Sequence, residues 1–202
     1  MISDFLTRLG FGSSDRGPTG SAHTVRGVRV ELLNSRPDID STAVLERLDE
    51  ALGLIETYQP WRLRHLRRDV RAIRVERYAC RGAFIPSEGT IITELTFLAR
   101  RDISAAPVAS SILHEGVHAR VHVISSRLAA RYGVYAAPRD SAREERLCRR
   151  SELAFGISLP EELGAPVIER ALASLQLDDA GVAPSVDWRV AQQRIDEVDR
   201  GG

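Results

Sequence analysis

The sequence predicts an α+β fold that is mostly helical, with a small sheet preceding a helix that holds an H-E-x-x-H motif. Short segments before residue 98 alternate apolar and polar residues, as half-buried strands do. Longer segments on both sides of them repeat apolar residues every three or four positions, as amphipathic helices do. A chain of 202 residues is long enough to bury one substantial core. We therefore expect a single domain.

Residues 1–22 are expected to form a flexible lead-in, followed by one domain over residues 23–202. The stretch 10–21, GFGSSDRGPTGS, is rich in glycine and serine, which favours a flexible chain. Partial alternation of apolar residues over 25–33 predicts a first strand.

A helix is predicted from Ser41 or Thr42, either of which can cap it, to about Tyr58. Its apolar positions repeat at helical spacing, and Pro60 ends it. The arginine-rich residues 61–71 follow. We interpret them as a helix face that is solvated or paired with carboxylates, because the 28 basic and 28 acidic residues of the chain cancel.

Three further strands are predicted before the motif, over residues 73–78, 82–85 and 90–97, with a turn at 86–89. A small sheet placed directly before an H-E-x-x-H helix is typical of zinc peptidases. An edge strand of such a sheet can bind an extended peptide by strand addition, which we state here as a hypothesis.

The motif helix is predicted to begin near Ser104, a possible N-cap, and Pro107, which suits a first helical turn. An apolar stripe would bury this helix. Its members are Leu113, Val117, Val121 and Ile124. The two motif histidines run beside the stripe, which places them at the edge of the core.

His114 and His118 stand four residues apart, so on a helix they share one face. Their imidazole nitrogens could bind one zinc ion. Glu115 lies about 100° around the helix from His114. From there its carboxylate can reach a water on the metal and act as general base.

A catalytic zinc usually has three protein ligands, so a third must come from elsewhere. His122 lies about 12 Å along the helix from His114, too far to share the ion. A following helix, predicted from residue 140 or 141 to about 156, offers Glu144 and Glu145. Helical projection puts Glu144 nearer the centre of its buried face, so periodicity favours Glu144.

The motif HEGVHAR at residues 114–120, followed by REERLC at 143–148, resembles a set of bacterial proteins of the gluzincin type. Their pattern is HExxHAR followed by R-x-E-x-x-C. The resemblance covers residues 108–156, about a quarter of the chain. It implies that the glutamate three positions before Cys148, which is Glu145, is the third ligand.

The C-terminal part is predicted to form two more helices, over about 160–177 and 187–198. Between the motif helix and the glutamate helix lies a predicted loop over 131–138. Its Tyr132 and Tyr135 are candidates for stabilising a developing oxyanion.

The predicted function is that of a zinc-dependent metallohydrolase, most simply a peptidase acting on a peptide or protein. One Zn²⁺ would be held by His114, His118 and Glu145, and Glu115 would be the general base. The alternative is a binding or interaction protein in which a structural zinc site joins two helices.

Composition argues against several other classes. Zero net charge gives no bulk attraction to nucleic acid. No apolar run approaches the length of a membrane span, and the N-terminus lacks a long apolar secretory segment. Two cysteines are too few for a disulfide framework, so reduced thiols and a cytoplasmic location are expected. Cys148 is expected to be a buried, unreactive thiol.

Overall fold

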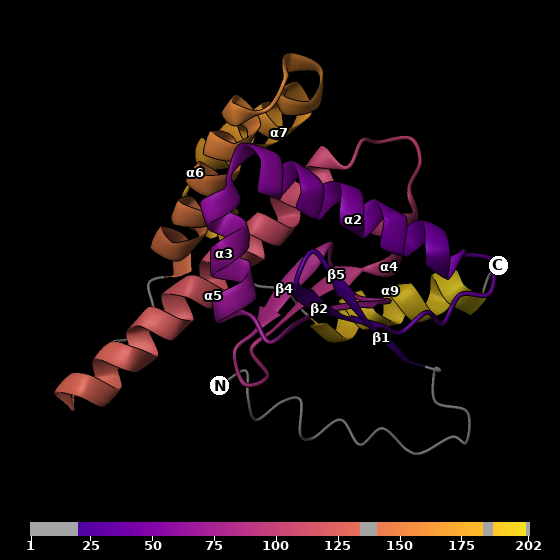
Figure 1. The fold of residues 1–202 in the computed structure, drawn as a ribbon, viewed down its shortest axis with the longest axis horizontal. Helices are drawn as coiled ribbons and strands as arrows, with labels where there is room; N and C mark the ends of the chain where they lie inside the picture. The colour runs from indigo at the N-terminus through magenta and orange to yellow at the C-terminus, as the bar shows by residue number, and fades with distance from the viewer. Residues whose placement is uncertain (1–19, 134–140, 184–187, 201–202) are drawn as a thin grey trace.

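A five-stranded mixed sheet and the helices packed around it make up the part of the chain that the structure describes (Figure 1). The computed structural model describes residues 20–133, 141–183 and 188–200. The strands are β1 (Ser21–Val25), β2 (Val28–Leu32), β3 (Ala72–Glu76), β4 (Gly82–Ile85) and β5 (Thr90–Glu94). The helices are α2 (Ser41–Tyr58), α3 (Pro60–Asp69), α4 (Leu95–Ala99), α5 (Ala106–Tyr132), α6 (Ser141–Ser158), α7 (Glu161–Leu175), α8 (Asp179–Val182) and α9 (Trp188–Arg200). The predicted α+β fold, mostly helical with a small sheet, is confirmed.

The sheet has the order β1-β2-β3-β5-β4, with a parallel centre and antiparallel margins. β3 pairs in parallel with both β2 and β5, whereas β1 and β4 pair antiparallel with their neighbours. All five residues of β5, which pairs in parallel with β3 and antiparallel with β4, are buried. β4 is therefore an edge strand of this sheet, and it lies next to α5.

The N-terminal segment forms a hairpin: β2 confirms a strand within the predicted residues 25–33, whereas β1 before it was not predicted. β1 and β2 are joined by Arg26 and Gly27, whose φ angles are 46° and 72°. Two successive positive φ angles are typical of the tight turn that joins antiparallel strands. β1 begins at Ser21, slightly before the predicted boundary of the domain. The predicted lead-in otherwise falls on residues 1–19, outside the described part of the chain.

The last strand is shorter than predicted, because the chain turns into a helix at Glu94. The Glu94 side chain accepts a hydrogen bond of 2.8 Å from the backbone N–H of Phe97. This contact caps the first turn of α4, so residues 95–97 are helical rather than extended.

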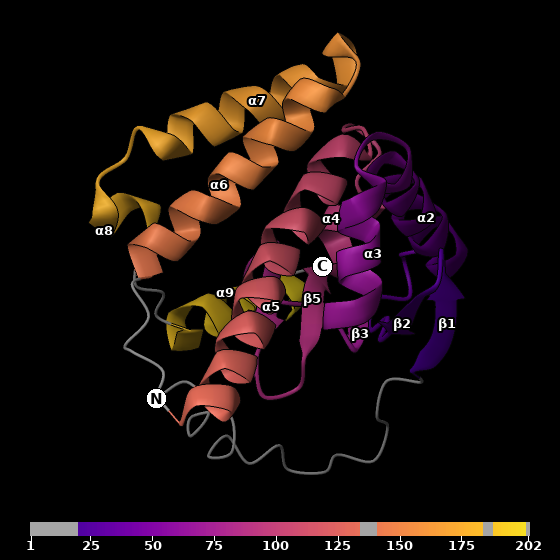
Figure 2. The ribbon, with the colours of Figure 1, turned by 60° about the vertical axis from the view of Figure 1, so that its left-hand side comes forward.

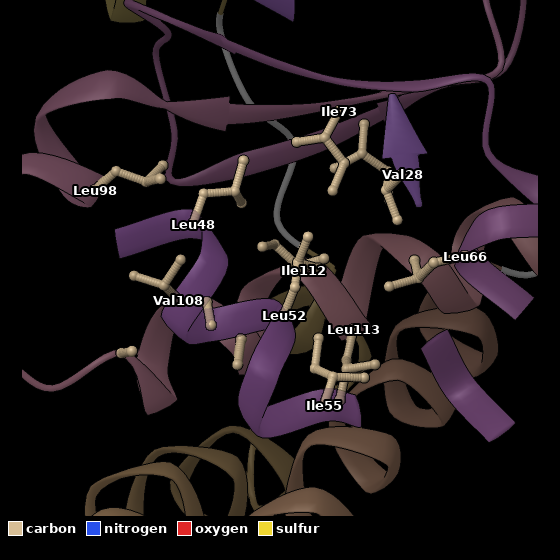
Figure 3. Packing of buried hydrophobic residues seen from close by; sticks show 14 of the residues in the cluster. Val28, Leu48, Leu52, Ile55, Leu66, Ile73, Leu98, Val108, Ile112 and Leu113 are labelled. Atoms are coloured by element: carbon tan, nitrogen blue, oxygen red, sulfur yellow. The ribbon is translucent and has the colours of Figure 1, made fainter. Parts of the chain in front are cut away.

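The apolar core lies between the sheet and helices α2 and α5 (Figure 3). Leu48, Leu52 and Ile55 of α2 are fully buried, as their helical spacing predicted. They belong to one cluster with Ile73 of β3 and Ile112 of α5. This cluster fixes the position of the first half of α5.

Helix α5 is buried only in its first half. Its buried residues end at Ala119, and beyond that point the helix extends away from the sheet (Figure 1). Ile124 and Leu128 are 40% and 50% exposed. The prediction that the apolar stripe stays buried as far as Ile124 is therefore wrong, because the elements that cover the first half end before this residue.

Helices α6 and α7 pack against each other and α6 packs along α5 (Figure 2). The α6–α7 contact is close at two glycines: a Cβ atom on Gly164 would clash with the carbonyl oxygen of Gly156. The bounds of both helices agree with the predictions to within two residues at each end. No described helix is both long enough and apolar enough to cross a membrane.

Candidate metal centre

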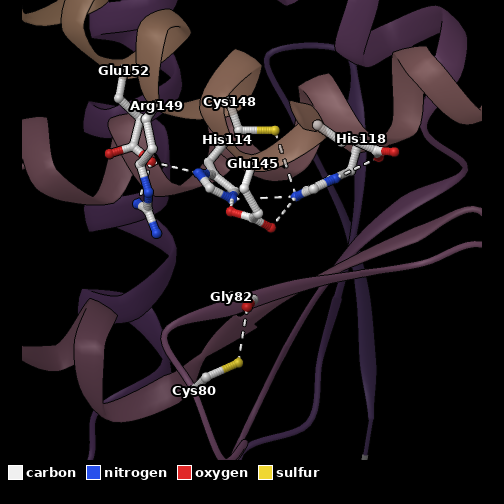
Figure 4. Close-up of polar contacts among 9 residues, drawn as sticks. Cys80, Gly82, His114, His118, Glu145, Cys148, Arg149 and Glu152 are labelled. Atoms are coloured by element: carbon white, nitrogen blue, oxygen red, sulfur yellow. Dashed lines mark hydrogen bonds and ion pairs between the residues drawn. The ribbon is translucent and has the colours of Figure 1, made fainter. Parts of the chain in front are cut away.

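The two motif histidines meet on the face of α5 that α6 covers. Their Nε2 atoms are 3.3 Å apart, and their side chains are 8% and 18% exposed for His114 and His118. Figure 4 shows both rings turned toward a common point beneath α6. The four-residue spacing thus brings two imidazole nitrogens together on one face of the helix, as predicted.

Glu145 reaches the same point from α6. Its Oε2 lies 3.2 Å from Nε2 of His114, and its Oε1 lies 3.1 Å from Nε2 of His118. The carboxylate therefore faces both nitrogens that a metal would use (Figure 4). Its role as third ligand stays a prediction, but the structure brings together all three residues of the predicted set.

The spacing of these donors fits a metal ion. Zinc bound to imidazole nitrogen at about 2.0–2.1 Å with tetrahedral angles separates its ligand atoms by about 3.3–3.4 Å. The two Nε2 atoms lie 3.3 Å apart, and each lies 3.1 or 3.2 Å from an oxygen of Glu145. These distances are close to the separation expected for zinc ligands. Two imidazoles and a carboxylate are also the donors that catalytic zinc takes in many hydrolases.

Two other glutamates of α6 hold the far side of each imidazole. Nδ1 of His118 is 2.7 Å from Glu144, and Nδ1 of His114 is 2.5 Å from Glu152. A carboxylate on the second ring nitrogen fixes the orientation of a metal-binding histidine. Glu144 is thus half-buried beside the site and contacts an Nδ1 atom rather than the Nε2 atoms. The contact of Glu152 with His114 was not predicted from the sequence.

Glu152 is itself held by a cation on its own helix. Arg149 donates a hydrogen bond of 2.7 Å from its guanidinium to the Glu152 carboxylate, whose side chain is 1% exposed. A carboxylate buried this deeply is stable only when it is paired. The spacing of three residues between Arg149 and Glu152 was the one sequence signal that could have indicated this pair.

Glu115 lies at the edge of the sheet. A Cβ atom on Gly82 of β4 would lie 3.3 Å from Cγ and 3.4 Å from Oε1 of Glu115, so a side chain at this position would crowd the Glu115 carboxylate. Burial raises the pKa of Glu115, the nearby His114 and His118 lower it, and the balance is a raised value. A buried carboxylate with a raised pKa is the kind of group that acts as general base near neutral pH.

Charges at the site are strongly coupled. Burial by itself lowers the pKa of His118, but contacts with Cys148, Glu144 and Glu145 outweigh it and raise the pKa to about 12. The pKa of His114 is raised in the same way, by Glu145 and Glu152 against the effect of burial. Burial alone raises the pKa of Glu145, yet its two histidine partners lower it well below the usual range. Without a metal, protonated histidines therefore balance these carboxylates.

Cys148 is part of the same cluster. It is fully buried, as predicted, and its Sγ is 3.5 Å from Nε2 of His118. One donor atom each from His114, His118 and Cys148 lies within 4.8 Å of the other two. The prediction placed Cys148 among apolar neighbours and missed this contact. The sequence signal that could have indicated this contact is the position of Cys148, three residues after Glu145 and four after Glu144 on one helix.

The candidates for stabilising an oxyanion fall away from the site or outside the described residues. Tyr132 is 62% exposed at the end of α5, about 21 Å along the helix from His118, so this candidate is wrong. Tyr135 lies outside the described residues. The His122 ring packs near Phe84 of β4, with 5.8 Å between ring centroids.

The chain has no significant match among protein-family models, curated proteins or solved structures. Any functional assignment therefore depends on the motif and on the geometry of the site.

Proposed function

We propose that this protein is a zinc-dependent hydrolase of the gluzincin type, most simply a peptidase. The observation that carries the proposal is the convergence of His114, His118 and Glu145 on one point, with the spacing that a metal requires. Glu115 follows the first histidine and lies against Gly82 at the edge of the sheet. The site thus has candidates for the metal ligands and for a base.

When bound, zinc would supply a water of lowered pKa and would polarise a scissile carbonyl. Glu115 would take a proton from that water and return it to the leaving amine. Glu144 and Glu152 hold the two imidazoles so that both Nε2 atoms stay directed at one point.

A peptide substrate is favoured by the strand beside the site. β4 is an edge strand of the five-stranded sheet and packs against α5 near the motif. An extended peptide that pairs with β4 would run past Gly82, next to Glu115. The sheet edge therefore supports a peptide or protein as the substrate.

The alternative is a non-catalytic interaction protein with a structural zinc site. It is favoured by one observation: the metal-binding groups come from two helices, α5 and α6, and include a cysteine. A zinc ion held there would join these helices, as closed structural sites do.

We also propose that the protein acts in the cytoplasm, without a nucleic-acid or membrane partner. Both cysteines, Cys80 and Cys148, are free thiols, which a reducing compartment preserves. The balanced charge of the chain supports no polyanionic partner.

The replacement Glu115→Gln tests this function. The purified wild-type and variant proteins are loaded with zinc and incubated with a mixture of synthetic peptides, and cleavage is followed by mass spectrometry. We expect Glu115→Gln to keep its zinc and to lose cleavage by two orders of magnitude or more, on the order of what general-base catalysis contributes. The matched control Glu169→Gln alters an exposed glutamate of α7 and should cleave as the wild type does.

Equal cleavage by Glu115→Gln and the wild type would exclude Glu115 as the base. Absence of cleavage by the zinc-loaded wild type on every peptide would favour the structural alternative.

A further inference from the structure

Cys148 sits at the metal centre, where the hydrolytic mechanism gives it no role. Its side chain is fully buried between α5 and α6, with Sγ 3.5 Å from Nε2 of His118. Other buried residues of α6, such as Phe155, contact the apolar core. A thiol directed at a metal-binding nitrogen instead has a polar neighbour that a core cysteine does not need.

The distance from Cys148 to His118 fits joint metal binding. Zinc at about 2.3 Å from sulfur and about 2.0–2.1 Å from nitrogen, with a tetrahedral angle, separates the two ligand atoms by about 3.5–3.6 Å. The observed separation of 3.5 Å agrees with this value. The same test is met by Glu145 with both histidines, as shown above.

Cys148 and Glu145 approach the histidine pair from different sides. In Figure 4 the Cys148 sulfur lies on one side of the line that joins the two Nε2 atoms, and the Glu145 carboxylate lies on the other. Both belong to α6, three residues apart. The sulfur is thus next to the histidines without occupying the place of the carboxylate.

We propose that Cys148 is a fourth metal ligand, whose sulfur fills the coordination position that a hydrolytic water needs. Four protein donors are typical of closed zinc sites, whereas catalytic sites keep one position for water. The resting centre is therefore closed by His114, His118, Glu145 and Cys148, and hydrolysis requires the sulfur to withdraw. This part, competition with water, rests on the proposed hydrolase function; the binding of sulfur to the metal does not.

Binding by Cys148 is a ligand exchange and needs no oxidant. The thiol would give its proton to solvent, a water would leave the metal, and a lone pair of the sulfur would form the new bond in its place. When the sulfur withdraws, it takes up a proton and a water takes its place.

Cobalt(II) distinguishes a sulfur ligand from a nearby thiol. The full chain is freed of metal, titrated with Co²⁺, and its absorption spectrum is recorded. A thiolate bound to Co²⁺ gives a charge-transfer band in the near ultraviolet, while the visible bands report that cobalt is bound in a low-coordinate site. We expect both sets of bands in the wild type.

The variants assign the band to one residue. Cys148→Ala and Cys148→Ser should lose the near-ultraviolet band and still bind about one Co²⁺, since three ligands remain. Two replacements are used because one could impair folding, which circular dichroism reports. The matched control is Cys80→Ala: Cys80 is the other thiol of the chain, half-buried, and its Sγ–H donates to the carbonyl oxygen of Gly82 at 2.9 Å. This variant should keep the band.

Each outcome decides the proposal. A band that persists in both Cys148 variants, or that is missing from a cobalt-loaded wild type, would show that the thiol only hydrogen-bonds to His118. Loss of the band in both Cys148 variants and its retention in Cys80→Ala would support the proposal.

Peptide cleavage then separates this proposal from the hydrolase. If both hold, zinc-loaded Cys148→Ala should cleave faster than the wild type, by several-fold, because water no longer competes with sulfur. A sulfur band without any cleavage would support the ligand and contradict the hydrolase. A cleaving enzyme without a sulfur band would do the reverse.

Discussion

The two sides of helix α5 are stabilised by different interactions. On one side Val108, Ile112 and Leu113 are at most 2% exposed and join the core formed with α2 and the sheet. On the other side His114 and His118 meet the glutamates of α6. The apolar side is stabilised by burial of hydrocarbon, whereas the polar side buries charges that are costly unless they are paired. We infer that the apolar side maintains the fold, and that the polar side serves the proposed binding of a metal ion.

Removing a metal ligand should have the largest effect, a loss of bound zinc, and should leave the apolar side of α5 unchanged. His118→Ala and Glu145→Ala should lose most of their zinc, because only two ligands hold the ion whenever the Cys148 sulfur withdraws from it. Zinc per chain after dialysis, measured by elemental analysis, checks this. The control His122→Ala, one turn further along α5, should keep its zinc. Zinc retained in Glu145→Ala would show that the third ligand lies elsewhere.

A cavity on the apolar side of α5 should lower the stability of the fold. Leu52 of α2 is fully buried, so Leu52→Ala should lower the free energy of unfolding by about 2–5 kcal/mol. The control Leu172→Ala, at a position 45% exposed, should change it by less than about 1 kcal/mol. Urea denaturation measures both. The comparison fails if folded Leu52→Ala loses its affinity for zinc while its unfolding free energy is unchanged.

Replacing Glu144 by alanine should weaken zinc binding less than replacing Glu145, although the two residues are neighbours. Glu144 contacts Nδ1 of His118, so Glu144→Ala should keep about one zinc and weaken its binding by about 10–100-fold. Competition with a chromophoric chelator measures the affinity, with the exposed Glu161→Ala as control. Complete loss of zinc in Glu144→Ala, but not in Glu145→Ala, would reverse the two roles.

The metal-free protein should show the smallest effect, a dependence of stability on pH. The pKa of His118 rises from 6.5 to about 12 on folding, so this residue stabilises the fold below pH 6.5, and that stabilisation is lost as the pH increases toward 12. The pKa of Glu145 is lowered from 4.5, so its stabilisation is present above pH 4.5 and is lost in acid.

The melting temperature of the metal-free protein should therefore be highest between about pH 4.5 and about pH 6.5 and should decrease in mild alkali. Zinc-loaded protein should show the opposite trend above pH 6.5, because zinc binds deprotonated histidine. A melting temperature of the metal-free protein that increases steadily to alkaline pH would contradict the coupling between the histidines and the glutamates.

The sequence alone predicted what depends on local pattern. The period of the apolar residues located α2 and α5, and the motif brought His114 and His118 to one face of a helix. For the third ligand, periodicity favoured Glu144, which is half-buried and contacts Nδ1 of His118, while the resemblance to gluzincin-type proteins pointed to Glu145, which faces the Nε2 atoms.

What the sequence could not predict depends on how two helices cross. The contacts of Glu152 with His114 and of Cys148 with His118 join residues far apart in the chain. Only the packing of α6 along α5 determines which face of α6 meets the histidines, and no local pattern encodes that. The exposure of Ile124 was missed for the same reason, since periodicity does not show where the covering elements end.

The central claim is that the polar side of α5 holds a metal ion, and the zinc content of the purified protein tests it most directly. Elemental analysis of the wild type, prepared without added metal and then reloaded and dialysed, should give about one zinc per chain. The double variant His114→Ala/His118→Ala, treated in the same way, should give almost none. A wild-type protein that remains metal-free after reloading, or a double variant that retains as much zinc, would contradict the claim.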